Sequence, residues 1–215
     1  MRESLDHGAA DDTRRRLVSA ALKQFGRHGF TATSTRALAA EAGTNIASIA
    51  YHFGSKAGLY RACGEHVAAA ITETVGAPRD HAGCSPAEAA ELLERMMRAM
   101  VGFLCTSPAA DTLVAFLLRE MAEQGAALDT IYGSLIEPKH RELSVLWGAA
   151  TGRDAESEAV RLAVFAMIGQ VVYFRIGRPV VQRRMGWDDI GPAEAARIAD
   201  ILARNLRAAI KGQRL

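Results

Sequence analysis

The sequence contains few residues that interrupt helices. Proline occurs 6 times in 215 residues, and no stretch alternates Val, Ile and Thr with polar residues as a half-buried strand would. Alanine and leucine instead recur at helical spacing. The sequence therefore predicts an all-α protein with about nine to ten helices.

Cysteine and long apolar runs are also scarce. The three cysteines, Cys63, Cys84 and Cys105, are widely spaced and odd in number, which does not fit a disulfide framework. The first residues are charged where a signal peptide is apolar. The longest apolar segment, Leu162 to Phe174, has 13 residues, fewer than the roughly 20 that cross a bilayer. We expect a soluble, cytoplasmic protein without a membrane segment.

Motifs of catalysis and cofactor binding are missing. The sequence has no HExxH, GxSxG, P-loop or GxGxxG motif, and its histidines have no paired metal-ligand spacing. We therefore expect no catalytic residues, no metal and no cofactor. An all-α enzyme and a helical binding module that does not bind DNA are the alternatives outside the class argued below.

Positive charge is concentrated in one segment. Residues 13–60 contain seven basic residues and one acidic residue, Glu41, for a net charge of +6, whereas residues 61–215 contain 18 basic and 19 acidic residues, for a net charge of −1. Phosphate contacts supply most of the sequence-independent affinity for nucleic acids. The pattern favours DNA binding by the first segment, although a solvated basic surface would have the same composition.

The chain divides into a tail, a small domain and a larger domain. Residues 1–10 have no apolar period and are expected to be a disordered tail. A helix capped by Asp11 or Asp12 follows, with one apolar face, and Gly29 ends it. We expect a DNA-binding domain at residues 11–57 and a larger helical domain at 58–215.

Two short helices joined by a tight turn occupy the centre of the small domain. The second helix begins near Thr33 or Ser34 and ends at Gly43, where a reversal within three residues favours positive φ. The third helix has Asn45 as its N-cap and ends at Phe53. Longer helices lie on both sides of this pair, and the one that follows is capped by Ser55 and runs to about Val75. The pattern predicts a helix-turn-helix.

The third helix has an apolar inward side and a polar outward side. Leu38, Ile49 and Phe53 form the inward stripe. The outward residues are short or planar, which suits a major groove ~12 Å wide; they are Asn45, Ala47, Ser48, Tyr51 and His52. A packing role for Tyr51 and a capping or packing role for His52 are the alternatives.

The segment from Thr33 to Tyr60 resembles the DNA-binding signature of the TetR/AcrR repressors. The shared residues are Leu38-Ala39, Glu41-Ala42-Gly43, His52-Phe53 and Ser55-Lys56, preceded by a helix that ends in Phe25-Gly26-Arg27-His28-Gly29-Phe30. The segment departs from the common pattern at Thr44, Ile46, Ala50-Tyr51 and Gly58.

This resemblance implies a homodimer that binds double-stranded operator DNA. The third helix would read bases, and the first helix together with Arg36, Tyr51, His52 and Lys56 would hold phosphates. Two half-sites one DNA turn apart, ~34 to 36 Å, would be bound together. The expected operator is therefore nearly palindromic.

Helix start signals recur after residue 75. A Gly- and Pro-containing loop at 76–85 precedes Ser85-Pro86-Ala87-Glu88, which combines a Ser cap, Pro at the first position and Glu three residues after the cap. Five helices are expected after this loop: Ser85 to Cys105, Ser107-Pro108 to Gly125, Leu128 to Ala150, Glu156 to Ile176, and Gly191-Pro192 to Lys211. Pro138 should kink or break the third of them, and Pro179 should end the fourth.

The larger domain resembles a CerR-type C-terminal domain found in one branch of the same repressor family. The resemblance lies in the stretch LLREMAEQGAALDTIYGSLIEPKHREL from Leu118 and in Ile168 to Trp187. It implies small-molecule induction and dimerisation through two helices. The helix around 162–174 is apolar on nearly all sides, and packing it with the last helix against a symmetry mate would bury it.

Candidate ligand contacts are polar or aromatic residues on apolar helix faces, since small-molecule pockets are mostly apolar with a few placed polar groups. An ordinary core position is the alternative for each. The candidates are Met100, Phe103, Phe116, Arg119, Tyr132, His140, Trp147, Gln170, Tyr173 and Phe174. The expected function is a ligand-responsive repressor released from its operator by a small-molecule inducer; a constitutive DNA-binding regulator without an inducer is the alternative.

Overall fold

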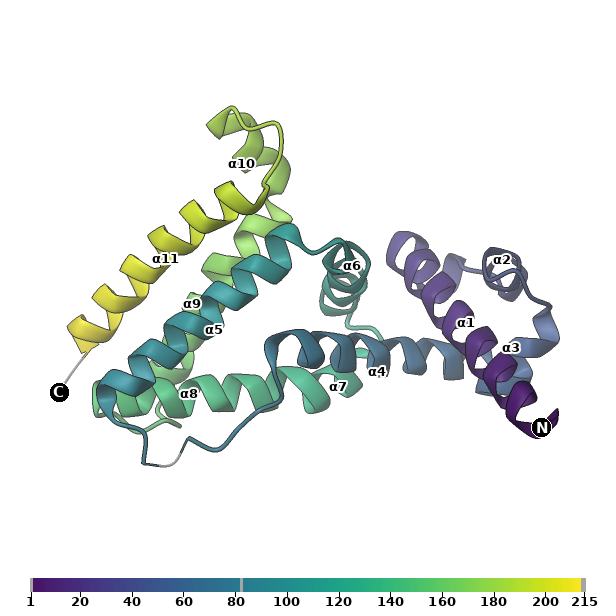
Figure 1. The fold of residues 1–215 in the computed structure, drawn as a ribbon, viewed down its shortest axis with the longest axis horizontal. Helices are drawn as coiled ribbons and strands as arrows, with labels where there is room; N and C mark the ends of the chain where they lie inside the picture. Colours follow the sequence, from purple (N-terminus) through teal and green to yellow (C-terminus); the bar gives the residue numbers. More distant parts are fainter. Residues whose placement is uncertain (1, 82, 214–215) are drawn as a thin grey trace. The chain divides into compact units, whose positions relative to one another are not determined.

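The computed structural model describes residues 2–81 and 83–213, and all regular secondary structure within these ranges is helical (Figure 1). This confirms the all-α prediction. The chain forms two compact units. Unit 1 contains Met1–Ile71 and Asp111–Leu135, and unit 2 contains Thr72–Ala110 and Ile136–Leu215.

Unit 1 begins with four helices. They are α1 (Arg2–Ala32), α2 (Thr35–Glu41), α3 (Ile46–Phe53) and α4 (Lys56–Val75), of which the last continues into unit 2 at Thr72. Gly29 has φ 77° and ψ 173°, so it interrupts α1 where the sequence predicted a stop. Ser34 and Asn45 cap α2 and α3 with their side chains.

The start of α1 differs from the prediction. The sequence predicted a disordered tail at residues 1–10, but α1 begins at Arg2, and the expected caps Asp11 and Asp12 lie inside the helix. No proline interrupts this stretch, and alanine, leucine and glutamate within it favour the helix. Hydrophobic period alone does not detect a helix that lacks an apolar face.

Unit 1 extends further along the chain than the predicted boundary after residue 57. Its core includes Leu17, Phe25, Leu59 and Cys63 from α1 and α4, all fully buried. It also takes in most of α6 (Pro108–Glu123), together with α7 (Leu128–Ile131) and most of the π-helical turn η1 (Tyr132–Ile136). Phe116 of α6 is buried with its ring 5.4 Å from that of Tyr60.

A buried polar network joins α4, α6 and the start of α7. The Tyr60 hydroxyl donates a hydrogen bond to Glu120 Oε1, and the Ala127 amide donates to Glu120 Oε2 over 2.9 Å. Burial, followed by the hydrogen bond to Glu120, raises the pKa of Tyr60 above its ordinary range, so its hydroxyl keeps the proton that it donates. The network fixes α6 against the helix that follows the helix-turn-helix.

Unit 2 is a bundle in which α5 packs against three other helices. α5 (Pro86–Thr106) contacts α8 (Glu137–Thr151), α9 (Glu158–Ile176) and α11 (Pro192–Gln213) (Figure 1). Ser85, Pro86 and Glu88 form the predicted capping box. The core is aliphatic and aromatic; its fully or almost fully buried members include Leu93, Met97, Val101, Leu146, Trp147, Val164, Val171, Leu202 and Leu206.

In the larger domain the structure breaks one predicted helix near its proline, as expected, and contains one helix that was not expected. The helix expected from Leu128 to Ala150 is divided into α7, η1 and α8, because the ring of Pro138 occupies the first turn of a new helix and the π-helical turn precedes it. α9 ends at Ile176, as predicted, and an unpredicted helix, α10 (Arg178–Met185), follows it. Pro179 lies in the first turn of α10, where its missing N–H costs nothing.

The predicted loop at 76–85 is attached to α8 by a buried carboxylate; Ala82 lies outside the described residues. Glu142 accepts hydrogen bonds from the Arg79 amide (3.1 Å), His81 Nε2 (2.9 Å) and Lys139 Nζ (2.7 Å). Burial alone would raise the pKa of Glu142, but these hydrogen bonds and the charge of Lys139 lower it below its ordinary value of 4.5.

Glu142 should therefore make stability depend on pH. A carboxyl group whose pKa is lowered by folding stabilises the protein above its unfolded pKa, near 4.5, and this contribution is lost as pH falls through the folded pKa. Glu142→Gln should cost about 2 kcal/mol at pH 7, and urea unfolding should show the difference from the wild type shrinking below about pH 4.5. The matched control, Glu91→Gln on the surface of α5, should have little effect at either pH; a Glu142→Gln deficit that persists at pH 3 would contradict the assignment.

α9 is unusually exposed for an apolar helix. It is long and apolar enough to cross a membrane by length and composition, with a mean hydropathy of 1.6, and only 22% of its apolar window is buried. α5 and α6 pass the same test only if the bent pair is counted as one span. The sequence estimate of a 13-residue apolar segment was too short, because the helix includes residues on both sides of it.

The exposed residues of α9 and α11 form two regular stripes. Their spacings alternate between four and three residues, which is the heptad pattern of helices that pack side by side. Leu162 is 59% exposed, Tyr173 51% and Ile201 47%. We call these residues the seam: Leu162, Ala166, Gly169, Tyr173 and Ile176 on α9, and Ile201, Asn205, Ala208 and Gly212 on α11.

Candidate nucleic-acid interface

The turn between α2 and α3 is closed by backbone hydrogen bonds and by an arginine. Gly43 has φ 61°, as its predicted role requires. The Gly43 amide donates to Ala40 O (3.1 Å), and the Thr44 amide donates to Ala39 O (2.9 Å). Arg16 Nη1 donates to Ala42 O over 3.3 Å, so α1 braces the turn.

The predicted inward residues hold α3 in place. Leu38 and Ile49 are buried, and Phe53 is half-buried, with the Arg14 guanidinium carbon 5.3 Å from its ring centroid. For the basic residues of the first helix, phosphate contacts and a solvated surface were the two interpretations of the sequence. Arg16 and Arg14 have structural contacts that the run of charge did not indicate, because Ala42 and Phe53 are 26 and 39 positions away along the chain.

The outward residues of α3 present one continuous face to solvent. Tyr51 is 81% exposed, and Asn45 and Ala47 are also exposed. His52 is half-buried, with its ring 4.8 Å from that of Tyr51 in an edge-on arrangement. Because the Tyr51 side chain is so exposed, it does not pack in the core, which was the alternative interpretation. The outward face of α3 is therefore available to contact another molecule.

Asn45 and Ser48 also have structural roles. Asn45 Oδ1 accepts hydrogen bonds from the Ser48 amide (3.0 Å) and hydroxyl (3.2 Å), and the Ser48 and Thr44 hydroxyls lie 2.8 Å apart. A carboxamide has two donors besides its oxygen. The NH2 group of Asn45 is therefore available to donate to another molecule, whereas the Ser48 hydroxyl already has hydrogen-bond partners within the protein.

Basic residues flank this face. Arg36 on α2 is exposed, and Lys56 at the start of α4 is half-buried, with its ammonium 4.3 Å from the ring centroid of Phe30. A cation over an aromatic face is held in place without being neutralised. Lys56 is thereby positioned at the end of α4 that follows α3.

The predicted ligand contacts do not form one group. Phe116 and Arg119 belong to unit 1, where Arg119 donates to Gly26 O and Arg27 O over 3.3 Å each and pairs with Glu123. Tyr132 also belongs to unit 1 and is exposed. For Phe116 and Arg119 the structure indicates positioning of α1 and α4 instead of contact with a cavity of the larger unit.

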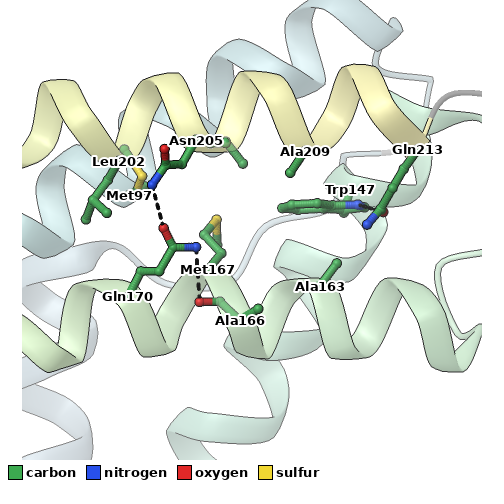
Figure 2. Close-up of a pocket in the computed structure, with 11 residues that line it drawn as sticks. Met97, Trp147, Ala163, Ala166, Met167, Gln170, Leu202, Asn205, Ala209 and Gln213 are labelled. Carbon is green, nitrogen blue, oxygen red and sulfur yellow. Dashed lines mark hydrogen bonds between the residues drawn. The ribbon is translucent and has the colours of Figure 1, made fainter.

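Within unit 2, two of the predicted residues line a cavity of about 110 Å³ (Figure 2). These are Trp147 on α8 and Gln170 on α9. The other candidates in unit 2 lie elsewhere: Phe103 is buried, Tyr173 is in the seam, the His140 ring contacts Phe165, and Met100 and Phe174 are half-buried. Sequence reasoning missed the remaining walls, which come mainly from small or aliphatic residues of α9 and α11.

An exposed polar helix braced by a glycine turn, with cations on its flanks, is the arrangement of a helix-turn-helix DNA-binding protein. Two family models agree with it. Residues 17–63 match the model described as bacterial regulatory proteins, tetR family, and residues 89–213 match the C-terminal domain of the HTH-type transcriptional dual regulator CecR. The chain is also 39% identical over 184 residues to the HTH-type transcriptional dual regulator CecR of Shigella flexneri, covering 82% of each chain.

The chain therefore belongs to the TetR family of transcriptional regulators. Its C-terminal domain is of the CecR type rather than the CerR type expected from the sequence. Solved structures share the fold: a TetR-like regulator from Rhodococcus sp. RHA1 (TM-score 0.66, 22% identity, 93% of this chain and 96% of that chain) and AibR in complex with isovaleryl coenzyme A and operator DNA (TM-score 0.65, 17% identity, 89% and 96%). The matching families and relatives are all described as transcriptional regulators, and none is described as an enzyme.

Proposed function

We propose that the protein is a ligand-responsive repressor that binds a nearly palindromic operator as a homodimer and leaves it when a small molecule binds. The observation that carries the proposal is the exposed face of α3, with Tyr51 81% exposed between basic residues of neighbouring helices. Such a helix enters the major groove, and its flanking cations contact phosphates. Arg36, Asn45, Ala47, Ser48, Tyr51, His52 and Lys56 are the proposed DNA contacts. The protein acts in the cytoplasm, where its operator is.

The seam supports the homodimer. Large apolar side chains such as Leu162, Tyr173 and Ile201 are about half exposed at heptad spacing, and Gly169 and Ala208 let helices approach closely. Two copies joined by α9 and α11 would form a four-helix interface. By its hydropathy alone, α9 could equally well be covered by a membrane. A membrane contact of α9 would not explain the matching stripe of exposed residues on α11.

Ligand response requires that unit 2 act on the DNA-binding helices. α4 passes from unit 1 to unit 2 within one helix, and α6 returns the chain to unit 1. A ligand that favours a different tilt of α4 would move the two recognition helices out of groove register. A coupling of ~1 to 3 kcal/mol changes affinity by roughly 5- to 150-fold.

The test is footprinting of the purified protein on the DNA upstream of its own gene across a salt series. Affinity should fall roughly 10³-fold between 50 and 200 mM salt if six or more phosphates are contacted. A protected region that is not nearly symmetric, or an affinity that does not depend on salt, would refute the operator proposal.

Two substitutions test the assigned DNA contacts. Tyr51→Phe and Lys56→Ala should each weaken operator binding by about tenfold, and Lys56→Ala should also reduce the salt slope by about one. Lys56→Gln keeps a polar stem beside Phe30 and separates loss of charge from loss of packing. Arg95→Ala on α5 is the surface control. Wild-type affinity in both Tyr51→Phe and Lys56→Ala would refute these two contacts.

A constitutive regulator without an inducer is the second candidate. It would bind the operator with the same salt dependence, but no small molecule would alter that binding. The cavity between α5, α8, α9 and α11 favours the ligand-responsive candidate. Operator affinity that is unchanged by every compound shown to bind the protein would favour the constitutive regulator.

A further inference from the structure

The cavity of unit 2 lies between four helices and has no charged lining. Figure 2 shows Trp147 and Gln170 at its two ends, with α9 and α11 as its long walls. The lining consists of aliphatic, sulfur-containing and small side chains, one indole and three carboxamides: Met97, Trp147, Ala163, Ala166, Met167, Gln170, Leu202, Asn205, Leu206, Ala209 and Gln213. We infer that this cavity binds a compact, uncharged molecule with an apolar body and one hydroxyl or carbonyl group.

The volume limits the size of the ligand. The cavity measures about 110 Å³, and an apolar cavity of about 150 Å³ holds a benzene molecule. The apolar body of the ligand is therefore no larger than a six-membered ring, and its polar group lies at the open end of the cavity beside Gln170 and Asn205. Coenzymes, nucleotides and fused polycyclic compounds are too large.

The lining excludes a charged ligand. No Asp, Glu, Lys or Arg is among the lining residues. An ionised carboxylate or ammonium group moved into such a site without a partner of opposite charge loses several kcal/mol of hydration energy. The apolar part of the ligand would contact Met97, Met167 and Leu202, where burial is favourable.

The polar end of the cavity is formed by two carboxamides, Gln170 and Asn205, whose side chains are exposed in the single chain. Asn205 and the neighbouring lining residue Ala166 belong to the seam, so a partner copy bound there would cover this end. Asn205 Nδ2 donates to Gln170 Oε1 over 3.0 Å, and Gln170 Nε2 is 3.5 Å from Ala166 O, which is a long and weak hydrogen bond. Each carboxamide has two N–H donors and an oxygen with two lone pairs. The pair therefore retains donors and acceptors that one hydroxyl or carbonyl of a ligand can use.

The opposite end is closed by a different contact. The Trp147 indole N–H donates to Gln213 Oε1 over 2.9 Å, which holds the last described turn of α11 against α8. The indole is almost fully buried, so its emission reports on the cavity rather than on solvent. The only other tryptophan of the sequence, Trp187, lies outside the lining, with Arg197 over its ring.

This ligand class belongs to the ligand response proposed above. Only the expectation that ligand binding releases DNA rests on that proposed function. Binding itself is tested with phenol, which has seven non-hydrogen atoms and is uncharged at pH 7, in a Trp187→Phe variant of the full chain. Trp147 emission should change saturably, with a Kd of ~1 mM or below. Cyclohexylammonium, which also has seven non-hydrogen atoms but is charged at pH 7, is the size-matched control and should produce no saturable change.

A cavity-filling substitution locates the binding. Ala163→Leu places a larger side chain in the cavity and should weaken phenol binding at least tenfold while the protein stays folded by circular dichroism. Ala159→Leu, on the exposed first turn of the same helix, is the matched control and should bind phenol as the parent does. Because Ala163→Leu could also shift Trp147 emission directly, isothermal titration calorimetry with phenol is the second measurement.

Three results would overturn the inference: no saturable response to phenol, an equal response to cyclohexylammonium, or undiminished binding in Ala163→Leu. Footprinting with and without saturating phenol separates the inference from the proposed function. If phenol binds at the cavity and the operator complex is unaffected, the site stands and its role as the inducer site fails. If operator binding is absent under all conditions while phenol binds, only the proposed function fails.

Discussion

Replacing both Leu162 and Ile201 with Glu should disrupt the proposed dimer and leave a monomer. Both side chains are about half exposed in the single chain and lie in the seam, so the folded chain tolerates charge there, whereas a dimer would bury four carboxylates against one another. Losing the second recognition helix removes the avidity of two-site binding, which is worth roughly 10²- to 10⁴-fold. Light scattering gives the mass, and footprinting on the full operator gives the affinity.

The control for this experiment is Ala196→Glu, which adds a carboxylate to an exposed position of α11 outside the seam. It should remain a dimer with wild-type operator affinity. A double variant that stays dimeric would place the interface elsewhere. A wild-type protein that is monomeric in solution but binds lipid vesicles through α9 would replace the dimer by a membrane contact.

Tyr60→Phe should destabilise unit 1 by about 2 kcal/mol, although it removes only one oxygen atom. Glu120 is fully buried, and its carboxylate is held by the Tyr60 hydroxyl and the Ala127 amide. Removing the hydroxyl leaves a buried carboxyl oxygen without its donor, and lost hydrogen bonds to charged groups cost about 1.5 to 3 kcal/mol. Urea unfolding measures the change in the free energy of unfolding.

Two comparisons isolate the hydrogen bond. Glu120→Gln can accept from the Ala127 amide with its oxygen and donate from its NH2 group to the Tyr60 oxygen, so it keeps both contacts and should cost less than Tyr60→Phe does. Tyr132→Phe, which removes the hydroxyl of an exposed tyrosine in the same unit, should be nearly neutral. The role of the network would be disproved by a Tyr60→Phe variant that unfolds at the wild-type urea concentration.

This network also makes a functional prediction about α6. Arg119 holds the end of α1 through two carbonyl oxygens, and the adjacent Glu120 holds α4 through Tyr60. Arg119 and Glu120, which are adjacent on α6, therefore hold α1 and α4, the helices before and after the helix-turn-helix. Tyr60→Phe should therefore weaken operator binding more than its surface controls do, because the recognition helix depends on the position of α4.

Local signals in the sequence were sufficient for the helix-turn-helix. Ser34, Asn45 and Ser85 cap their helices through hydrogen bonds to amides three residues away, and Gly43 adopts the positive φ that its turn requires. Such interactions involve neighbours in the chain, so residue type and spacing predict them. The same reasoning failed at Pro179, since a proline can begin a helix as well as end one.

The sequence by itself determined the helical class, the position of the recognition helix and the family, because each depends on residues within a few positions of one another. Only the tertiary structure assigned residues 111–135 to the DNA-binding unit and gathered Met97, Trp147, Gln170 and Gln213 around one cavity. The four cavity residues are 23 to 116 positions apart along the chain. Which of several apolar helix faces meet is decided by the packing of whole helices, and no local pattern encodes that choice.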